Sequence, residues 1–186
     1  PLGTAKRLQE AMARTDVHIV SNPEFLSEGN AIRDFLEPSR IVIGSNSREY
    51  SERVAKLYSK LNVPILMSSW ESAELIKHTA NAFLAMKLTF VNEIATLCEM
   101  TGADIKDVTD GIGYDPRIGS DYMNAGPGWG GSCFPKDSAS LAQVARSFGF
   151  DFTLLEHTID LNQKHLDRTA QKVQRLVPTD SPHRKV

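Results

Sequence analysis

Residues 70–100 read WESAELIKHTANAFLAMKLTFVNEIATLCEM, and they divide the chain into two parts of different character. The stretch predicts a single helix of about 45 Å, at the usual rise of 1.5 Å per residue. Apolar residues occur on nearly every side of this helix, which is typical of a helix buried from several directions. Because a chain of 186 residues is too small to cover such a helix, we expect a homodimer formed through it.

The residues before this helix alternate between short apolar runs and helical patterns. Strands are predicted at residues 17–20 (VHIV), 40–44 (RIVIG) and 63–67 (VPILM), helices at residues 4–15 and 47–61, and a helical turn at residues 30–35. Such alternation is typical of a parallel sheet with helices packed on its faces. We therefore predict an α/β domain over residues 1–67.

No strand is predicted after residue 68, so the second part of the chain should be helical. Helices are predicted at residues 104–110, 135–147 and 152–177, with a glycine-rich loop at residues 111–131 and a polar tail at residues 178–186. The expected fold class is therefore α/β followed by mostly α. The second domain is expected to cover residues 68–177.

The composition limits the partners and the location of the protein. A net charge of -2, from 21 Lys and Arg against 23 Asp and Glu, excludes a general attraction to nucleic acid or acidic membranes. The two cysteines cannot form a disulfide framework and fit a reducing compartment. With no apolar run of about 18 residues and no signal-peptide pattern, we expect a cytoplasmic protein. The absence of an initiator methionine suggests processing, or a piece of a longer chain.

The most unusual segment is residues 126–137, GPGWGGSCFPKD. Its first six residues match G-x-G-x-x-G, and Asp151 follows at a suitable distance, so one hypothesis is a dinucleotide-binding turn. The strand that must precede such a turn is not predicted, because residues 120–125 are polar. The alternatives are a surface loop, or glycines that let backbone N–H groups approach a ligand.

Cys133 follows these glycines and precedes Pro135, a residue typical of the first turn of a helix. Thiols at helix N-termini form thiolates more readily, because the free N–H groups and the helix dipole favour negative charge. Cys133 is therefore a candidate nucleophile, with a buried structural thiol as the alternative. Cys98 lies within the long apolar helix and is predicted to be a core residue.

Four other polar residues are candidates for chemistry. Lys77 and Asn81 are four residues apart on the long helix and could together stabilise an oxyanion, unless they form a solvated stripe. Glu24 and Glu28 follow the strand predicted at residues 17–20 and could act as acids or bases, or be capping or solvated carboxylates. The five histidines show no metal-ligand spacing, so no metal site is predicted.

Four segments occur together and in order: residues 21–29 (SNPEFLSEG), 34–44 (DFLEPSRIVIG), 77–85 (KHTANAFLA) and 126–137. With them, almost the whole chain resembles the UDP-glucose/GDP-mannose dehydrogenase family. The resemblance implies the end of a Rossmann-like NAD-binding domain followed by a central helical domain for catalysis and dimerisation. It also implies an oxidoreductase that uses two NAD to oxidise C6 of UDP-glucose to the carboxylate of UDP-glucuronate. GDP-mannose or another nucleotide sugar is the alternative substrate.

The resemblance also implies roles for individual residues. Cys133 would attack the aldehyde-level intermediate, giving a thiohemiacetal and then a thioester. Lys77 and Asn81 would stabilise the oxyanion. Asp137 would help to position Lys77 and water, and Glu24 would act as the base for hydrolysis. Substrate contacts are implied for Phe25, Leu26, Glu28, Arg117 (from a neighbouring subunit), Tyr122, Asn124 and Gly130, and NAD contacts for Glu24, Cys133 and Lys136.

Three further expectations follow from the resemblance. Lys77 and Cys133 should lie close together although they are far apart in the sequence. Residues 178–186 should lead toward a UDP-binding domain. Residues 1–186 alone should not oxidise UDP-glucose, because the first strand and glycine turn of the family are not among them. A helical oligomerisation module without enzymatic activity is the competing hypothesis, and a cysteine hydrolase is a third, for which no histidine partner of Cys133 is evident.

Overall fold

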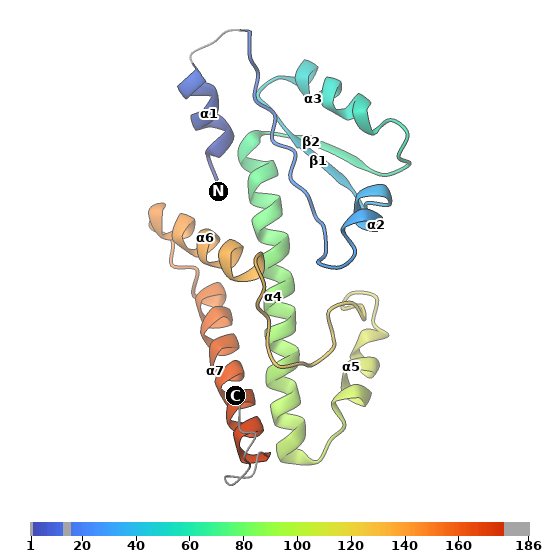
Figure 1. Cartoon of the computed structure of the whole chain (residues 1–186), viewed down its shortest axis with the longest axis vertical. Coiled ribbons are helices and arrows are strands. Elements are labelled where there is room, and N and C mark those ends of the chain that lie inside the picture. The colour runs from blue at the N-terminus through green and yellow to red at the C-terminus, as the bar shows by residue number, and fades with distance from the viewer. Residues whose placement is uncertain (1, 13–15, 177–186) are drawn as a thin grey trace, which may run out of the picture. The chain divides into compact units, whose positions relative to one another are not determined.

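The computed structural model describes residues 2–12 and 16–176 (Figure 1). These residues divide into two compact units, residues 1–80 and 81–186, and each unit is described by itself. The end of the helix predicted at residues 4–15 and the tail predicted at residues 178–186 lie outside the described residues. The predicted domain boundary after residue 67 stays a prediction.

The first unit has the predicted α/β character. Its elements are α1 (Thr4–Met12), α2 (Ala31–Leu36), β1 (Ile41–Gly44), α3 (Arg48–Ala55), the 3₁₀ helix η1 (Lys56–Tyr58) and β2 (Ile65–Ser68). The two strands pair in parallel, with Ile41 opposite Ile65 and Gly44 opposite Ser68. The parallel sheet is therefore confirmed, and the predicted strands at residues 40–44 and 63–67 are displaced by one or two residues.

The strand predicted at residues 17–20 is wrong. Its neighbour Ser21 forms an isolated antiparallel bridge, donating its N–H to the Gly44 carbonyl (2.8 Å) and accepting from the Gly44 N–H (2.7 Å). Within the segment, the N–H of Ile19 donates to Oε1 of Gln9 (2.9 Å). A side chain of α1 thus takes a backbone hydrogen bond that a neighbouring strand would otherwise supply.

Burial in the small sheet is uneven. Every residue of β1 is buried, whereas β2 leaves Leu66 and Met67 exposed. Helix α3 packs against both strands, and Ser47 occupies its N-cap position without a side-chain capping hydrogen bond. The helix ends at Ala55 and continues as η1, so the prediction of one α-helix to residue 61 is wrong.

The second unit is helical, as predicted. Helix α4 (Trp70–Thr101) enters it from the first unit, and α5 (Ile105–Gly113), α6 (Phe134–Ser147) and α7 (Thr153–Leu176) follow (Figure 1). Helix α5 extends three residues into the predicted glycine-rich loop, and its N-cap Asp104 accepts from the N–H of Lys106. The core joins α4, α6 and α7 through Ala82, Leu141, Ala142 and Leu155, with Phe152 and Ile159 against them. The expected fold class, α/β followed by mostly α, is confirmed.

Helix α4 is less buried in the single chain than its apolar sequence suggests. Large apolar side chains remain exposed along it: Leu75, Phe83, Phe90, Leu97 and Met100. Cys98, on the same helix, is buried as predicted. None of the helices in the described part of the chain is long and apolar enough to cross a membrane.

Helix α7 buries a face that carries polar as well as apolar side chains. Leu154, Val173 and Leu176 are exposed. The buried positions are Leu155, Thr158, Asn162 and His165, which follow one another at helical spacing. The buried face of α7 is therefore largely polar, and its side chains need hydrogen-bond partners.

Candidate active site

In the first unit, Glu24 and Lys77 come together. The Nζ atom of Lys77 lies 3.3 Å from Oε1 of Glu24, and Oε2 of Glu24 accepts from the N–H of Leu26 (2.6 Å). The Lys77 side chain is 16% exposed, whereas that of Glu24 is 55% exposed. An ion pair that reaches solvent adds little to stability, about 0–1 kcal/mol. Its clearer effect is to orient the ammonium group of Lys77.

Two cations lie over the ring of Phe25, the residue after Glu24. The guanidinium carbon of Arg40 is 3.9 Å from the ring centroid, and Nζ of Lys77 is 5.5 Å from it. Both distances are within the range of cation–π attraction. The ring of Phe25 therefore connects this loop to Arg40, which precedes β1, and to Lys77 on α4.

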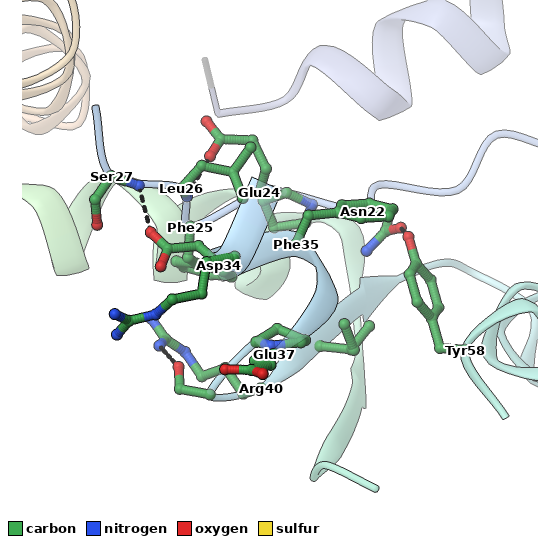
Figure 2. Close-up of a pocket in the computed structure, with 15 residues that line it drawn as sticks. Asn22, Glu24, Phe25, Leu26, Ser27, Asp34, Phe35, Glu37, Arg40 and Tyr58 are labelled. Atoms are coloured by element: carbon green, nitrogen blue, oxygen red, sulfur yellow. Dashed lines mark hydrogen bonds between the residues drawn. The ribbon is translucent and has the colours of Figure 1, made fainter. Parts of the chain in front are cut away.

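Hydrogen bonds hold both ends of the loop at residues 22–27. Nδ2 of Asn22 donates to the Val42 carbonyl (2.8 Å), and the Tyr58 hydroxyl donates to Oδ1 of Asn22 (2.5 Å). At the other end, the N–H of Ser27 donates to Oδ2 of Asp34 (2.8 Å), which holds the pKa of Asp34 below its ordinary value. Figure 2 shows Asn22, Ser27, Asp34 and Tyr58 around a cavity of about 350 Å³. Leu26 and Glu28 of this segment are exposed.

In the second unit, Cys133 lies at the start of α6, as predicted. It is the N-cap residue, and Pro135 stands in the first turn of the helix. The Cys133 carbonyl accepts from the N–H of Asp137 (2.9 Å). The thiol is half-buried, with Oγ of Ser132 3.6 Å from the sulfur. Cys133 is therefore the residue at which α6 begins, and its side chain makes no capping hydrogen bond to the helix.

Asp137 and Asn81 form a buried pair that joins α6 to α4. They are 4% and 8% exposed, and Nδ2 of Asn81 donates to Oδ2 of Asp137 at 2.6 Å. Nζ of Lys136 lies 3.6 Å from the other carboxylate oxygen, although most of the Lys136 side chain is exposed. The pair ties the first turn of α6, and with it Cys133, to the long helix. The proximity of Lys77 to Cys133 stays a prediction.

The loop between α5 and α6 carries the other residues predicted to bind substrate. Tyr122 has a positive φ of 59°, which is unusual for a residue with a side chain, and its ring is 6.4 Å from that of Phe134. Arg117 is exposed and pairs with Asp115 (2.6 Å). Their hydrogen bonds raise the pKa of Arg117 and lower that of Asp115. Asn124 is exposed on the same loop.

Trp129 is a residue of this loop that no sequence motif predicted to be functional. Its indole is buried, with Nε1 donating to Oγ1 of Thr89 (2.7 Å) and the ring edge-on to Phe134 at 6.3 Å. Gly130, which follows, is exposed. Residues 114–132 contain no strand, so the hypothesis of a dinucleotide-binding turn here lacks the structure that it requires. The feature of the sequence that could have identified Trp129 is a large aromatic residue within a glycine-rich loop.

The residues predicted to contact NAD belong to different units. Glu24 lies in the first unit, and Cys133 and Lys136 lie in the second. The carboxylate of Glu24 and the ammonium of Lys136 are each exposed within their own unit, and their contact with NAD stays a prediction. In residues 2–12 and 16–176, no group of three or more His, Cys, Asp or Glu is arranged to hold a metal ion.

Two family profiles match the chain. The NAD binding domain of the UDP-glucose/GDP-mannose dehydrogenase family matches residues 1–62, and the central domain of the same family matches residues 71–164. The two matches follow in the order expected from the resemblance.

Individual relatives agree with these profiles. UDP-glucose 6-dehydrogenase TuaD of Bacillus subtilis is 46% identical over 93% of the chain, and UDP-glucose 6-dehydrogenase of Rhizobium meliloti is 44% identical over 93%. The chain spans 39% and 42% of their lengths. Among solved structures, a UDP-glucose dehydrogenase from Pyrobaculum islandicum superposes with a TM-score of 0.85, at 36% identity over 92% of this chain and 40% of that one.

Proposed function

Because the chain belongs to the UDP-glucose/GDP-mannose dehydrogenase family, we propose that it carries the covalent chemistry of an NAD-dependent UDP-glucose 6-dehydrogenase. The observation that supports this most directly is Cys133 at the start of α6, one turn from the buried pair of Asp137 and Asn81. The relatives named UDP-glucose 6-dehydrogenase favour UDP-glucose over GDP-mannose. Two free cysteines support a location in the reducing cytoplasm.

The proposed reaction has three stages. NAD, when bound, would accept a hydride from C6 in each of two oxidations, and the C6 hydroxyl proton of the first oxidation would pass to solvent. After the first, the thiolate of Cys133 attacks the aldehyde carbon C6 and forms a C–S bond, giving an oxyanion. Loss of hydride from C6 in the second leaves a thioester. Glu24 then takes a proton from water, which attacks the thioester; the C–S bond breaks, and the sugar carboxylate and the thiol of Cys133 are released.

We assign the oxyanion to donors on α4. The Asn81 amide has two N–H groups, and its bond to Asp137 uses one of them. The Lys77 ammonium has three, and Glu24 faces one side of it. Each side chain therefore retains donors for an oxygen atom that becomes negatively charged. Lys77 and Asn81 are one helical turn apart on α4, so they lie on the same face of the helix. In this scheme Asp137 acts by orienting Asn81, through a contact that is already formed.

The assay for this function uses the gene product that carries this chain, because the chain spans about two fifths of its relatives. Purified protein is mixed with NAD and either UDP-glucose or GDP-mannose, and NADH is followed by absorbance. We expect two NADH for each UDP-glucose consumed and slow turnover of GDP-mannose. A preference for GDP-mannose would reject the substrate assignment. Folded protein that forms no NADH with either sugar would favour the oligomerisation module.

We also propose a homodimer formed through α4. The exposed aromatic side chains of Phe83 and Phe90 support this, because two large aromatic groups on one helix are a costly surface to leave in water.

The Phe83→Glu variant should therefore be monomeric and folded, since Phe83 is 57% exposed within its own chain. A buried, unpaired charge at a subunit interface costs several kcal/mol. The measurement is light scattering combined with circular dichroism on the 186-residue chain. Gln163→Glu, on the exposed side of α7, serves as the control and should remain dimeric. A dimeric Phe83→Glu variant, or a monomeric wild type, would exclude this interface.

A further inference from the structure

A single buried amide holds both backbone groups of Trp129. The N–H of Trp129 donates to Oδ1 of Asn162 (2.9 Å), and Nδ2 of Asn162 donates to the Trp129 carbonyl (2.8 Å). Asn162 lies on α7, 33 residues away in the sequence, and is 5% exposed. Its side chain pairs with the loop as a neighbouring strand would, and so restricts the backbone orientation of Trp129.

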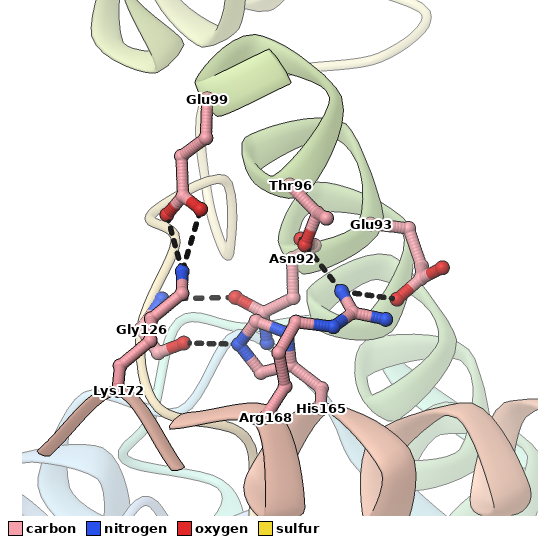
Figure 3. A network of polar contacts seen from close by, with 8 residues as sticks. All are labelled: Asn92, Glu93, Thr96, Glu99, Gly126, His165, Arg168 and Lys172. Carbon is pink, nitrogen blue, oxygen red and sulfur yellow. Dashed lines mark hydrogen bonds and ion pairs between the residues drawn. The ribbon is translucent and has the colours of Figure 1, made fainter. Parts of the chain in front are cut away.

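Gly126, three residues earlier, is held in the same way by two side chains. Its N–H donates to Oδ1 of Asn92 on α4 (2.9 Å), and its carbonyl accepts from Nε2 of His165 on α7 (2.8 Å). Figure 3 shows Gly126 between these two helices. Because a carbonyl can only accept, Nε2 of His165 carries the proton. We call Asn92, Asn162 and His165 the loop clamp.

The two helices that supply the loop clamp are themselves tied together. Nζ of Lys172 on α7 lies 2.5 Å from Oε1 of Glu99 on α4, and this bond lowers the pKa of Glu99. Arg168 donates to Oγ1 of Thr96 (2.5 Å) and lies 3.5 Å from Glu93 (Figure 3). The clamp therefore stands on two helices that are joined along the same interface.

The loop approaches α7 so closely that it requires glycine. Gly128 has a φ of +121°, and a Cβ atom there would lie 2.9 Å from the Leu166 side chain and 3.1 Å from Oδ1 of Asn162. The indole of Trp129 then contacts Phe134, the first residue of α6 and the neighbour of Cys133. A continuous path of contacts thus runs from Asn162 through Trp129 and Phe134 to the start of α6.

We propose that Asn162, supported by Asn92 and His165, is a positioning residue for Cys133, an inference that rests on the proposed role of Cys133 as nucleophile. Burying three polar side chains between helices is unfavourable unless each is hydrogen-bonded. Here all three bond to the backbone of one four-residue segment. That segment leads directly into the turn that carries the thiol, so the clamp determines where the sulfur stands.

The first test measures the reactivity of Cys133 in the 186-residue chain. A Cys98→Ala background leaves Cys133 as the single thiol, and iodoacetamide labelling is followed by intact mass. We expect Asn162→Leu to slow labelling at neutral pH by about tenfold, because the thiol loses its place at the helix N-terminus. Gln163→Leu, the exposed neighbour on α7, should remain within about twofold. A folded Asn162→Leu variant that is labelled at the wild-type rate would reject the proposal.

A second variant tests the hydrogen bonds themselves. In Asn162→Asp the introduced carboxyl has nearly the shape of the amide, and when protonated it offers one donor and one acceptor. Burial raises the pKa of such a carboxyl, so the folded state binds more protons than the unfolded state, and stability falls as pH rises through that value. The melting temperature of Asn162→Asp relative to Asn162→Leu should therefore increase from about pH 8 to about pH 5. An equal difference at both pH values would reject the hydrogen-bonding role.

Turnover by the gene product separates this inference from the proposed function. If Asn162 positions Cys133, Asn162→Leu should lower kcat for UDP-glucose by roughly 10²-fold with a smaller change in KM. An inactive wild type whose Cys133 labelling still depends on Asn162 would reject the dehydrogenase but keep the clamp. An active wild type whose kcat is unaffected by Asn162→Leu would keep the dehydrogenase and reject the positioning role of Asn162.

Discussion

Replacing Cys133 by alanine is expected to lower the formation of UDP-glucuronate by at least roughly 10³-fold, because no other group in the proposed reaction can form the thioester. In the proposed reaction, the first oxidation does not use the thiol. Any residual reaction should therefore stop at the aldehyde and yield one NADH for each sugar. The measurement is the ratio of NADH formed to UDP-glucose consumed, together with the identity of the product.

Cys98 provides the matched control for this experiment. It is the other cysteine of the chain, but it is buried within α4. Cys98→Ala should keep a ratio of two NADH per sugar and nearly the wild-type rate. A Cys133→Ala variant that still produced two NADH per sugar would show that the oxidation does not pass through a thioester on this residue.

The second large effect concerns stability. Asn81→Leu should lower the free energy of unfolding by about 2–3 kcal/mol, because it removes a charge-assisted hydrogen bond from the buried carboxylate of Asp137. Leucine is close to asparagine in size, so the loss reports the missing donor more than a cavity. Urea denaturation of the 186-residue chain, followed by circular dichroism, gives the value.

Two further variants interpret that measurement. Asn81→Leu combined with Asp137→Leu should recover part of the lost free energy of unfolding. The double variant no longer buries a carboxylate that has lost the Asn81 donor. Lys106→Ala breaks the exposed ion pair between Lys106 and Asp110 and should change stability by less than about 0.5 kcal/mol. If Asn81→Leu is as mild as Lys106→Ala, the contact between Asn81 and Asp137 is not important to the fold.

Much of the local structure could be predicted from the sequence, because its causes are local. The apolar run at residues 70–100 predicts α4 almost to the residue. Pro135 and the glycines before it correctly place Cys133 at the start of a helix. The strand predicted at residues 17–20 was wrong, because a short apolar run becomes a strand only if a partner strand supplies hydrogen bonds. Here Gln9 of α1 supplies one of them instead.

For the candidate site, too, the sequence predicted the residues but not their contacts. The sequence alone identified Cys133, Lys77, Asn81 and Glu24 as chemically suitable, and the resemblance added Asp137 and the family. The pairing of Lys77 with Glu24, and of Asn81 with Asp137, appeared in the tertiary structure.

The sequence by itself determined the order of the α-helices and of the two paired strands, the position of the thiol at a helix start and membership of a family. Those properties depend on neighbouring residues and on motifs that can be recognised without coordinates. The tertiary structure alone decided which face of α7 is buried and what Asn162 does there. The partners of a buried amide are chosen by packing, and those of Asn162 lie 33 residues away on a glycine-rich loop without periodicity. No local pattern records that contact, because the free energy that selects it arises only when α4, α6 and α7 pack together.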